Sequence, residues 1–345
     1  MRNLLYIFFS FFLFGGILAG TAQAQSVTGQ PDPVQYIVVP ETPGPSERVY
    51  IEVEGVGPFL GNAQITWQQD GKVVSAGVGI KKYSFTTKGI GDPTRIRVII
   101  DSETQGIMTH DFVFSPSVTH LVWEADTTAP PFYQGKTRYS AGAKVSVVAF
   151  PTVLLGGALV PSSKLSFQWR YKGSLVPEQS GLGRSTFALY GDQLQTGESV
   201  AVDVYSGAAR VGRAEIFIPA VEPKIVLYRY DPLRRTLLDA AFPDTIALGA
   251  QEITIDAQPY FFSTESRSKG FFLYEWTLNG QTAESPDAGK GLLTLRQTGQ
   301  GTGFATINVS LQNTDPDKFI QSAQTALRLA FGQQANSFIS NLFGL

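Results

Sequence analysis

The sequence of 345 residues contains no cysteine, which excludes disulfides, thiol chemistry and lipid attachment through an N-terminal cysteine. It has only two histidines, His110 and His120, so a structural zinc site would need carboxylates to complete its ligands. The motifs of serine hydrolases, of zinc proteases and of phosphate-binding loops are absent as well. We therefore expect no catalytic site and no cofactor. An enzyme whose site is assembled from distant loops, and is therefore not visible in the sequence, ranks third among the functions that we consider.

An excess of basic charge is also missing. The sequence has 27 Lys and Arg against 29 Asp and Glu, with a formal net charge of −2. Recognition of phosphate groups needs a basic surface, so nucleic acid is not expected as a partner. With 43% hydrophobic residues, the chain is long enough for two or three domains that each bury a core.

The N-terminus has the three parts of a secretory signal peptide. Met1-Arg-Asn precedes an apolar run of 16 residues, Leu4–Ala19, and Ala22-Gln-Ala24 follows as a cleavage site. We expect residues 1–24 to be removed and the protein to be exported, either to the medium or to the cell surface. The alternative is an uncleaved membrane anchor, although a span needs roughly 20 apolar residues. Residues 25–33 are predicted to be a linker.

Three stretches of the sequence repeat one pattern, in which a tryptophan is followed four residues later by glycine. The pairs are Trp67 and Gly71, Trp169 and Gly173, and Trp276 and Gly280. Each tryptophan ends a run of alternating apolar and polar residues, the signature of a strand with one buried face. The glycine supplies the positive φ of a tight hairpin turn. The tryptophans are 102 and 107 residues apart, which indicates repeated domains.

This pattern resembles the immunoglobulin-like superfamily in its bacterial Ig-like or PKD-like varieties. In that family a strand tryptophan packs across the core of a β-sandwich, and a short turn ending in glycine follows it. The resemblance implies that Trp67, Trp169 and Trp276 are core residues. It also assigns the position of the family's second disulfide cysteine to Val98, Val202 and Ile307.

The whole chain is also similar to uncharacterised secreted multi-Ig proteins of candidate-phylum bacteria. The similar segments are Leu121-Val-Trp-Glu-Ala-Asp, Pro130-Pro-Phe-Tyr-Gln-Gly-Lys and Pro259-Tyr-Phe-Phe-Ser. This resemblance implies no activity.

The predicted fold is therefore all-β, with three tandem Ig-like antiparallel β-sandwiches after the signal peptide. We place the first domain over residues 34–116, the second over 117–221 and the third over 222–332. A tail, 333–345, carries four apolar residues at helical spacing: Phe338, Ile339, Leu342 and Phe343. The spacing suits a short helix packed on the third domain or a peptide that binds a partner.

Two pairs of aromatic residues follow prolines and are candidates for a binding loop. They are Phe132 and Tyr133, in the long segment 127–142, and Phe261 and Phe262. We favour the interpretation that these rings close the open end of a sandwich or contact a protein. Exposed and coplanar rings would instead suit stacking on a sugar.

One segment has a partial calcium-binding pattern. Asn313, Asp315 and Asp317 place oxygen donors at alternate positions, as the start of a calcium loop does. The glycine and the glutamate of the EF-hand are missing, and a hairpin turn is expected at this place in any case. A turn is therefore favoured over a metal site.

The expected function is non-catalytic. The protein would be a structural, adhesion or assembly component of the envelope or of a surface appendage, with other envelope or surface proteins as its partners. A set of carbohydrate-binding modules, with polysaccharide as the partner, is the alternative. Membrane contact is expected only through the N-terminal segment, if it is retained. These expectations follow from the fold and do not identify a ligand.

Overall fold

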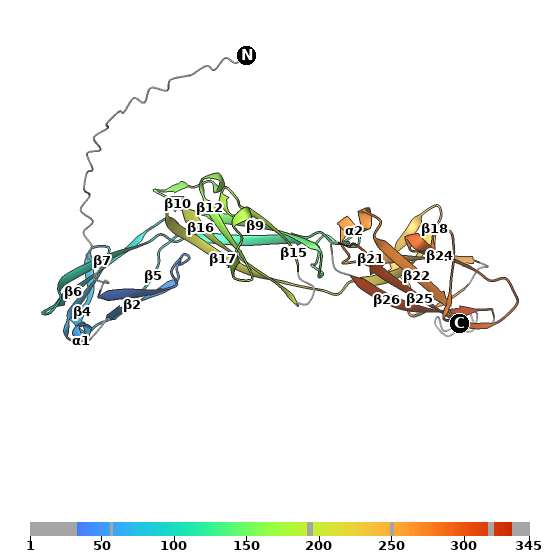
Figure 1. Cartoon of the computed structure of the whole chain (residues 1–345), viewed down its shortest axis with the longest axis horizontal. Coiled ribbons are helices and arrows are strands. Elements are labelled where there is room, and N and C mark those ends of the chain that lie inside the picture. Colours follow the sequence, from blue (N-terminus) through green and yellow to red (C-terminus); the bar gives the residue numbers. More distant parts are fainter. Residues whose placement is uncertain (1–32, 56–57, 192–195, 249–251, 317–320, 333–345) are drawn as a thin grey trace, which may run out of the picture.

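The computed structural model describes residues 33–55, 58–191, 196–248, 252–316 and 321–332 (Figure 1). The predicted signal peptide, most of the predicted linker and the tail 333–345 lie outside these ranges. Strands dominate, and the α-helices of the described residues are short: α1, Phe59–Asn62, and α2, Thr264–Ser268. The all-β prediction is confirmed. None of the described helices has the length and apolar character needed to cross a membrane.

A pair of facing sheets occurs three times along the chain. In the first sandwich one sheet has the order β1-β2-β5 and the other the order β4-β3-β6-β7. The strands are β1 (Val34–Val39), β2 (Arg48–Gly55), β3 (Gln64–Gln69), β4 (Lys72–Val78), β5 (Lys82–Thr86), β6 (Thr94–Ser102) and β7 (Gly106–Phe114).

The second sandwich repeats this order with β8-β9-β15 in one sheet and β13-β12-β16-β17 in the other. Its strands are β8 (Val118–Ala125), β9 (Lys144–Thr152), β12 (Ser166–Tyr171), β13 (Ser174–Leu175), β15 (Thr186–Tyr190), β16 (Gly197–Ser206) and β17 (Ala209–Pro219). Between β9 and β12 lies a small hairpin of β10 (Leu154–Leu155) and β11 (Ala158–Leu159), and β14 (Gly181–Leu182) pairs with β12.

The third sandwich has the same order again, with β18-β21-β24 facing β23-β22-β25-β26. These strands are β18 (Lys224–Asp231), β21 (Glu252–Tyr260), β22 (Phe272–Leu278), β23 (Gln281–Thr282), β24 (Leu292–Arg296), β25 (Gly303–Asn313) and β26 (Ser322–Phe331). Two strands are added at the edges: β19 (Arg235–Ala241) beside β18, and β20 (Thr245–Ala247) parallel to β26. In Figure 1 the three sandwiches lie in a row.

Each sandwich encloses its own hydrophobic cluster around one tryptophan. Trp67, Trp169 and Trp276 are 0, 0 and 2% exposed. Each indole N–H donates to a backbone carbonyl between the turn and the next long strand: to Ile80, at 2.9 Å, to Arg184, at 2.8 Å, and to Ala288, at 3.1 Å. A buried indole needs such an acceptor, so the repeat extends from the sequence to the hydrogen bonding of the cores.

The turns after the tryptophans have the geometry that the sequence predicts. Both central residues of each turn have positive φ, as type I′ hairpin turns require. The values are 49° and 83° at Asp70-Gly71, 50° and 80° at Lys172-Gly173, and 51° and 81° at Asn279-Gly280.

The strand register corrects one sequence assignment. Trp67 pairs with Val98 and Trp169 pairs with Val202, but Trp276 pairs with Val309. Ile307, which we expected to be the equivalent residue, pairs with Leu278 instead. Ile307 and Val309 are both buried on the same face of β25, so the apolar pattern alone could not detect a shift of two residues.

Candidate functional site at the junction of the second and third sandwiches

A long segment of the second sandwich, residues 126–142, reaches the third sandwich. This segment connects β8 to β9 and is called the junction loop below. It lies beside residues 261–264, which follow β21 and begin α2. Ser263 is the N-cap of α2, and its hydroxyl accepts a hydrogen bond from the backbone N–H of Ser266, at 3.3 Å.

Backbone hydrogen bonds join the junction loop to the third sandwich. The N–H of Thr128 donates to the carbonyl of Phe262, at 2.7 Å, and the N–H of Phe261 donates to the carbonyl of Thr128, at 2.8 Å. Thr127 and Ser263 form an isolated β-bridge beside them, and both are buried. The two sandwiches are thus connected by a short piece of antiparallel ladder.

A buried glutamine, Gln321, occupies the centre of the junction. Its side-chain nitrogen donates to the hydroxyl of Ser140, at 2.6 Å, and to the carbonyl of Ala141, at 3.0 Å. Its side-chain oxygen accepts from the backbone N–H of Ser263, at 2.8 Å, and from the side-chain amide of Asn313, at 3.3 Å. Gln321 is 5% exposed, and its amide uses its full hydrogen-bonding capacity across the two sandwiches.

Two consecutive residues of the junction loop are anchored in opposite sandwiches. Tyr139, which is fully buried, donates its hydroxyl to the carboxylate of Glu198 in the second sandwich, at 3.0 Å. Ser140, also fully buried, donates its hydroxyl to the carbonyl of Phe261 in the third. The linker between the sandwiches is held as well, because the N–H of Val221 donates to the carbonyl of Tyr139, at 2.8 Å.

The carboxylate of Glu198 is buried and has several partners. It accepts the hydroxyl of Tyr171, at 2.7 Å, and the amino group of Lys172 lies 3.5 Å away. Burial, together with the hydrogen bond to Glu198, raises the pKa of Tyr171 to about 12. A buried carboxylate is tolerated only with such compensation, so this cluster fixes the base of the junction loop.

The aromatic residues predicted for a binding loop have different environments. Phe262 is fully buried in the third core, with its ring centroid 5.4 Å from that of Phe272. Phe261 is half-buried and has a φ of 67°. Phe132 and Tyr133 are 62% and 46% exposed, on the junction loop.

The favoured expectation was that these rings close the end of a sandwich or contact a protein, and the exposure of Phe132 and Tyr133 contradicts its first part. They lie in a turn in which the N–H of Tyr133 donates to the carbonyl of Pro130, at 2.9 Å, and which carries their rings outward. The buried position of the loop is taken by Tyr139 instead. An added Cβ at Gly191 would collide with the Tyr139 hydroxyl, so the space around this ring is full.

The candidate calcium residues belong to the same junction. Asn313 and Asp315 are 1% and 5% exposed. The side-chain oxygen of Asn313 accepts the N–H of Asp315, at 3.1 Å, and Asp315 accepts the hydroxyl of Ser266, at 2.9 Å. Asp317 lies outside the described residues. Among the residues that are described, no cluster of three or more His, Asp or Glu is placed to hold a metal ion.

The structure thus brings three separate sequence candidates to one place: the junction loop, Phe261-Phe262 and the segment that begins at Asn313. Sequence reasoning missed the residues that connect them, Gln321 and Ser140. Neither belongs to a motif, and the two are 181 positions apart. Only the folded chain relates them.

No protein-family model matches the sequence, and no curated protein matches it. Several solved arrays of Ig-like or fibronectin-III domains are similar in structure. The three N-terminal domains of the outer capsid protein Hoc of bacteriophage RB49 share 13% identity, over 87% of this chain and 97% of that one, with a TM-score of 0.26. The central fibronectin-III array of RIM-binding protein shares 12%, over 86% and 97%, with a TM-score of 0.30. The insect immune protein hemolin shares 11%, over 84% and 96%, with a TM-score of 0.21. At these low values the likeness does not extend to function.

Proposed function

We propose that this chain is a non-catalytic surface component, in which tandem Ig-like sandwiches hold a contact surface at a fixed distance and orientation. The sequence of residues 1–24 supports export, and the repeated sheet order supports a division into domains at 34–116, 117–221 and 222–332. Its partners would be other envelope or surface proteins. The observation that carries the proposal is the buried junction around Gln321.

The junction supports a stiff connection for an energetic reason. Bending it would separate Gln321 from Ser140 and would break the backbone bonds of Thr128. Gln321 and Ser140 are buried. Each buried polar group left without a partner costs roughly 1–3 kcal/mol. The second and third sandwiches should therefore move as one body, as a spacer or an adhesive rod requires.

The same stiffness favours Phe132 and Tyr133 as contact residues. Both are exposed, while the loop that carries them is anchored at Tyr139 and Ser140. Exposed aromatic side chains on a fixed support lose little freedom on binding, which is the property of residues that dominate protein interfaces.

Capture of a partner from the envelope of cells that express the protein would test this role. The exported chain, residues 25–345, would be immobilised and compared with the double variant Phe132→Ser/Tyr133→Ser. We expect the double variant to lose the captured protein. The matched control is Phe150→Ser, which removes another aromatic residue, 55% exposed, from the same sandwich. Equal capture by all three proteins would contradict the proposed contact surface.

Carbohydrate binding is the alternative, and the exposure of Phe132 and Tyr133 favours it. Affinity electrophoresis in gels that contain different polysaccharides separates the two functions. Retardation of the wild type that disappears in the double variant, with an unchanged melting temperature, would identify a sugar-binding loop and would contradict the protein-contact role.

A further inference from the structure

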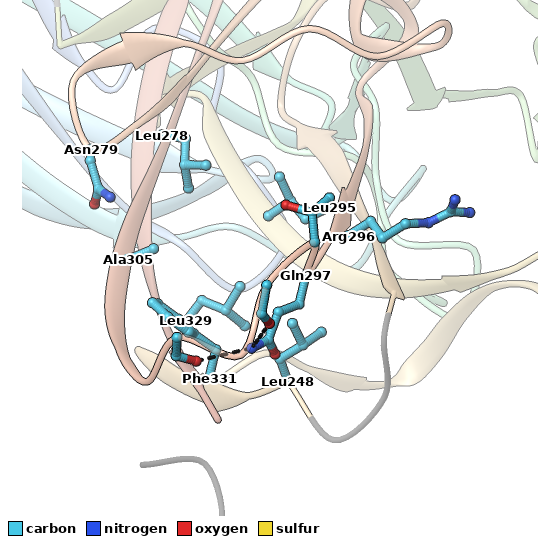
Figure 2. A pocket seen from close by; sticks show the side chains of 12 residues that line it. Leu248, Leu278, Asn279, Leu295, Arg296, Gln297, Ala305, Leu329 and Phe331 are labelled. Carbon is cyan, nitrogen blue, oxygen red and sulfur yellow. Dashed lines mark hydrogen bonds between the residues drawn. The ribbon is translucent and has the colours of Figure 1, made fainter. Parts of the chain in front are cut away.

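An apolar cavity lies at the end of the third sandwich opposite the junction. The junction is at the end of β25 and the start of β26, near Asn313 and Gln321, whereas the cavity contains residues from the start of β25 and the end of β26. Its volume is about 310 Å³. Its apolar lining, seen in Figure 2, comes from β22, β24, β25 and β26 and from the residue that follows β20: Leu248, Leu278, Leu295, Ala305, Leu329 and Phe331.

Two polar side chains at the cavity, those of Arg296 and Gln297, already have hydrogen-bond partners. Arg296, the charged residue of the lining, donates to the carboxylate of Glu252 through Nε, at 2.9 Å, and through Nη2, at 2.5 Å. The amide of Gln297 donates to the carbonyls of Gly299, at 2.9 Å, and Gly301, at 3.0 Å, as the dashed lines in Figure 2 show. The site therefore suits an apolar and uncharged ligand.

The chain leaves the third sandwich at the rim of this cavity. Phe331, the last residue of β26, contributes to the lining. Gly332 follows with a φ of 67°, and a Cβ added there would lie 2.7 Å from the carbonyl oxygen of Gly301, another lining residue. The segment 333–345 thus begins next to the cavity.

The segment 333–345 matches the cavity in chemistry and in reach. It contains no Lys, Arg, Asp or Glu. Its apolar residues begin at Phe338, after five residues that can extend by about 17 Å. The spacing of Phe338, Ile339, Leu342 and Phe343 is helical, and a helix would bring these four side chains to one face. Exposing such an apolar face to water is unfavourable in free energy, and burying it against apolar side chains is favourable.

We propose that residues 333–345 dock in this cavity of their own chain. A cavity of this size accommodates some of the four apolar side chains, while the remainder of the segment covers the rim. The short tether makes docking within one chain favourable, since short flexible linkers give effective concentrations of the order of millimolar. This inference does not depend on the proposed contact surface at Phe132 and Tyr133.

The absence of cysteine allows a direct test in the full chain. The variant Thr298→Cys/Ser340→Cys places one thiol at the cavity and one among the apolar residues of the segment. We expect an intramolecular disulfide to form rapidly under mild oxidation. The control Leu273→Cys/Ser340→Cys puts the first thiol on an exposed residue at the other end of the sandwich, and it should form the disulfide about tenfold more slowly or not at all.

A second variant separates docking from the effect of the tether. The same pair, Thr298→Cys/Ser340→Cys, is placed in a chain that also carries Phe338→Ser/Phe343→Ser. If the apolar face drives docking, the disulfide should form about tenfold more slowly in this chain, because the tether is unchanged and only the apolar contacts are lost. An unchanged rate would overturn the proposal. Disulfides that form mainly between two chains would also overturn it, because a second copy would then be the occupant.

A peptide of residues 333–345, carrying a fluorescent label, gives an independent measurement. Its fluorescence anisotropy should rise with a chain that ends at Gly332, provided that circular dichroism shows this chain to be folded. The full chain should bind the peptide about 100-fold more weakly, because its own segment competes at high effective concentration. Leu295→Ser in the shortened chain should weaken binding, and Leu273→Ser should not. Equal binding by the full and the folded shortened chains would contradict docking.

Discussion

The two junctions of this array differ in where their polar contacts lie. Between the first and second sandwiches, Arg210, whose side chain is 25% exposed, pairs with Glu41, whose side chain is 67% exposed, and Leu154 packs against Gly91. Between the second and third, Gln321 is 5% exposed and bridges both sandwiches. An exposed ion pair contributes about 0–1 kcal/mol and yields easily, whereas a buried, fully bonded amide resists any change of angle.

The difference shows that linker length alone does not decide how stiffly domains are joined. Both linkers are short: one contains Ser115 and Pro116, and the other is Pro219–Pro223. What distinguishes the second junction is the junction loop, which lies beside the linker and is anchored in both sandwiches.

The largest effect should come from the core of the second sandwich. Trp169→Ala should destabilise that sandwich by about 3–5 kcal/mol, the range for removing a large buried aromatic side chain. We expect faster hydrogen exchange in β16 of the second sandwich. Because the buried junction couples the second and third sandwiches, exchange in β25 of the third should also become faster, to a smaller extent. The first sandwich, measured at β6, should be unaffected.

The matched control is Trp67→Ala, which makes the same change in the first sandwich. It should accelerate hydrogen exchange in β6 and leave exchange in β16 nearly unchanged, because the first junction transmits little of the destabilisation to the second sandwich. Equal transmission across both junctions would show that they do not differ in stiffness.

Gln321→Leu should have the next largest effect. It removes the amide and leaves the N–H of Ser263 and the hydroxyl of Ser140 without this partner, at a cost of about 1–3 kcal/mol. We expect limited proteolysis to begin cutting at 220–223, a linker that the junction holds in the wild type. Gln324→Leu, an exposed position on β26, is the control and should leave the cleavage pattern unchanged. Cleavage at 220–223 that is as fast in the wild type as in Gln321→Leu would contradict the role of the amide.

Glu41→Gln should have a small effect. It removes the negative charge that faces Arg210 at the first junction, and exposed pairs of this kind contribute about 0–1 kcal/mol. The melting temperature should change little, and any change should diminish with added salt. A loss comparable to that of Gln321→Leu would mean that the first junction is also held by polar contacts.

The last effect appears only at alkaline pH. The pKa of Tyr171 is raised to about 12, above the ordinary value of 10, because burial and the hydrogen bond to Glu198 favour the neutral phenol. Its contribution to stability is complete below pH 10 and is lost as the pH rises from about 10 to about 12. The melting temperature of Tyr171→Phe should therefore fall less steeply with pH over this range than that of the wild type. An equal fall of the melting temperature with pH in both proteins would argue against this titration.

The sequence was sufficient for the parts of the structure that depend on neighbouring residues. The alternation before each tryptophan and the glycine four residues after it determine a strand and a type I′ turn, and both are present three times. The sequence was insufficient where two apolar residues on the same face of one strand could pair with the tryptophan, as Ile307 and Val309 could. It also could not reveal Gln321, whose partner Ser140 is distant in the chain, or show that Tyr139 would be buried in place of Phe132.

Distances between spin labels across each junction report how stiffly the neighbouring sandwiches are joined. Because the chain has no cysteine, labels can be attached at Ile107→Cys with Leu182→Cys across the first junction, and at Leu182→Cys with Leu273→Cys across the second. All three positions are exposed. We predict a narrow distance distribution across the second junction, which broadens in Gln321→Leu, and a broader one across the first. A distribution across the second junction that is as broad as the first, or that does not respond to Gln321→Leu, would contradict a stiff unit built on the buried amide.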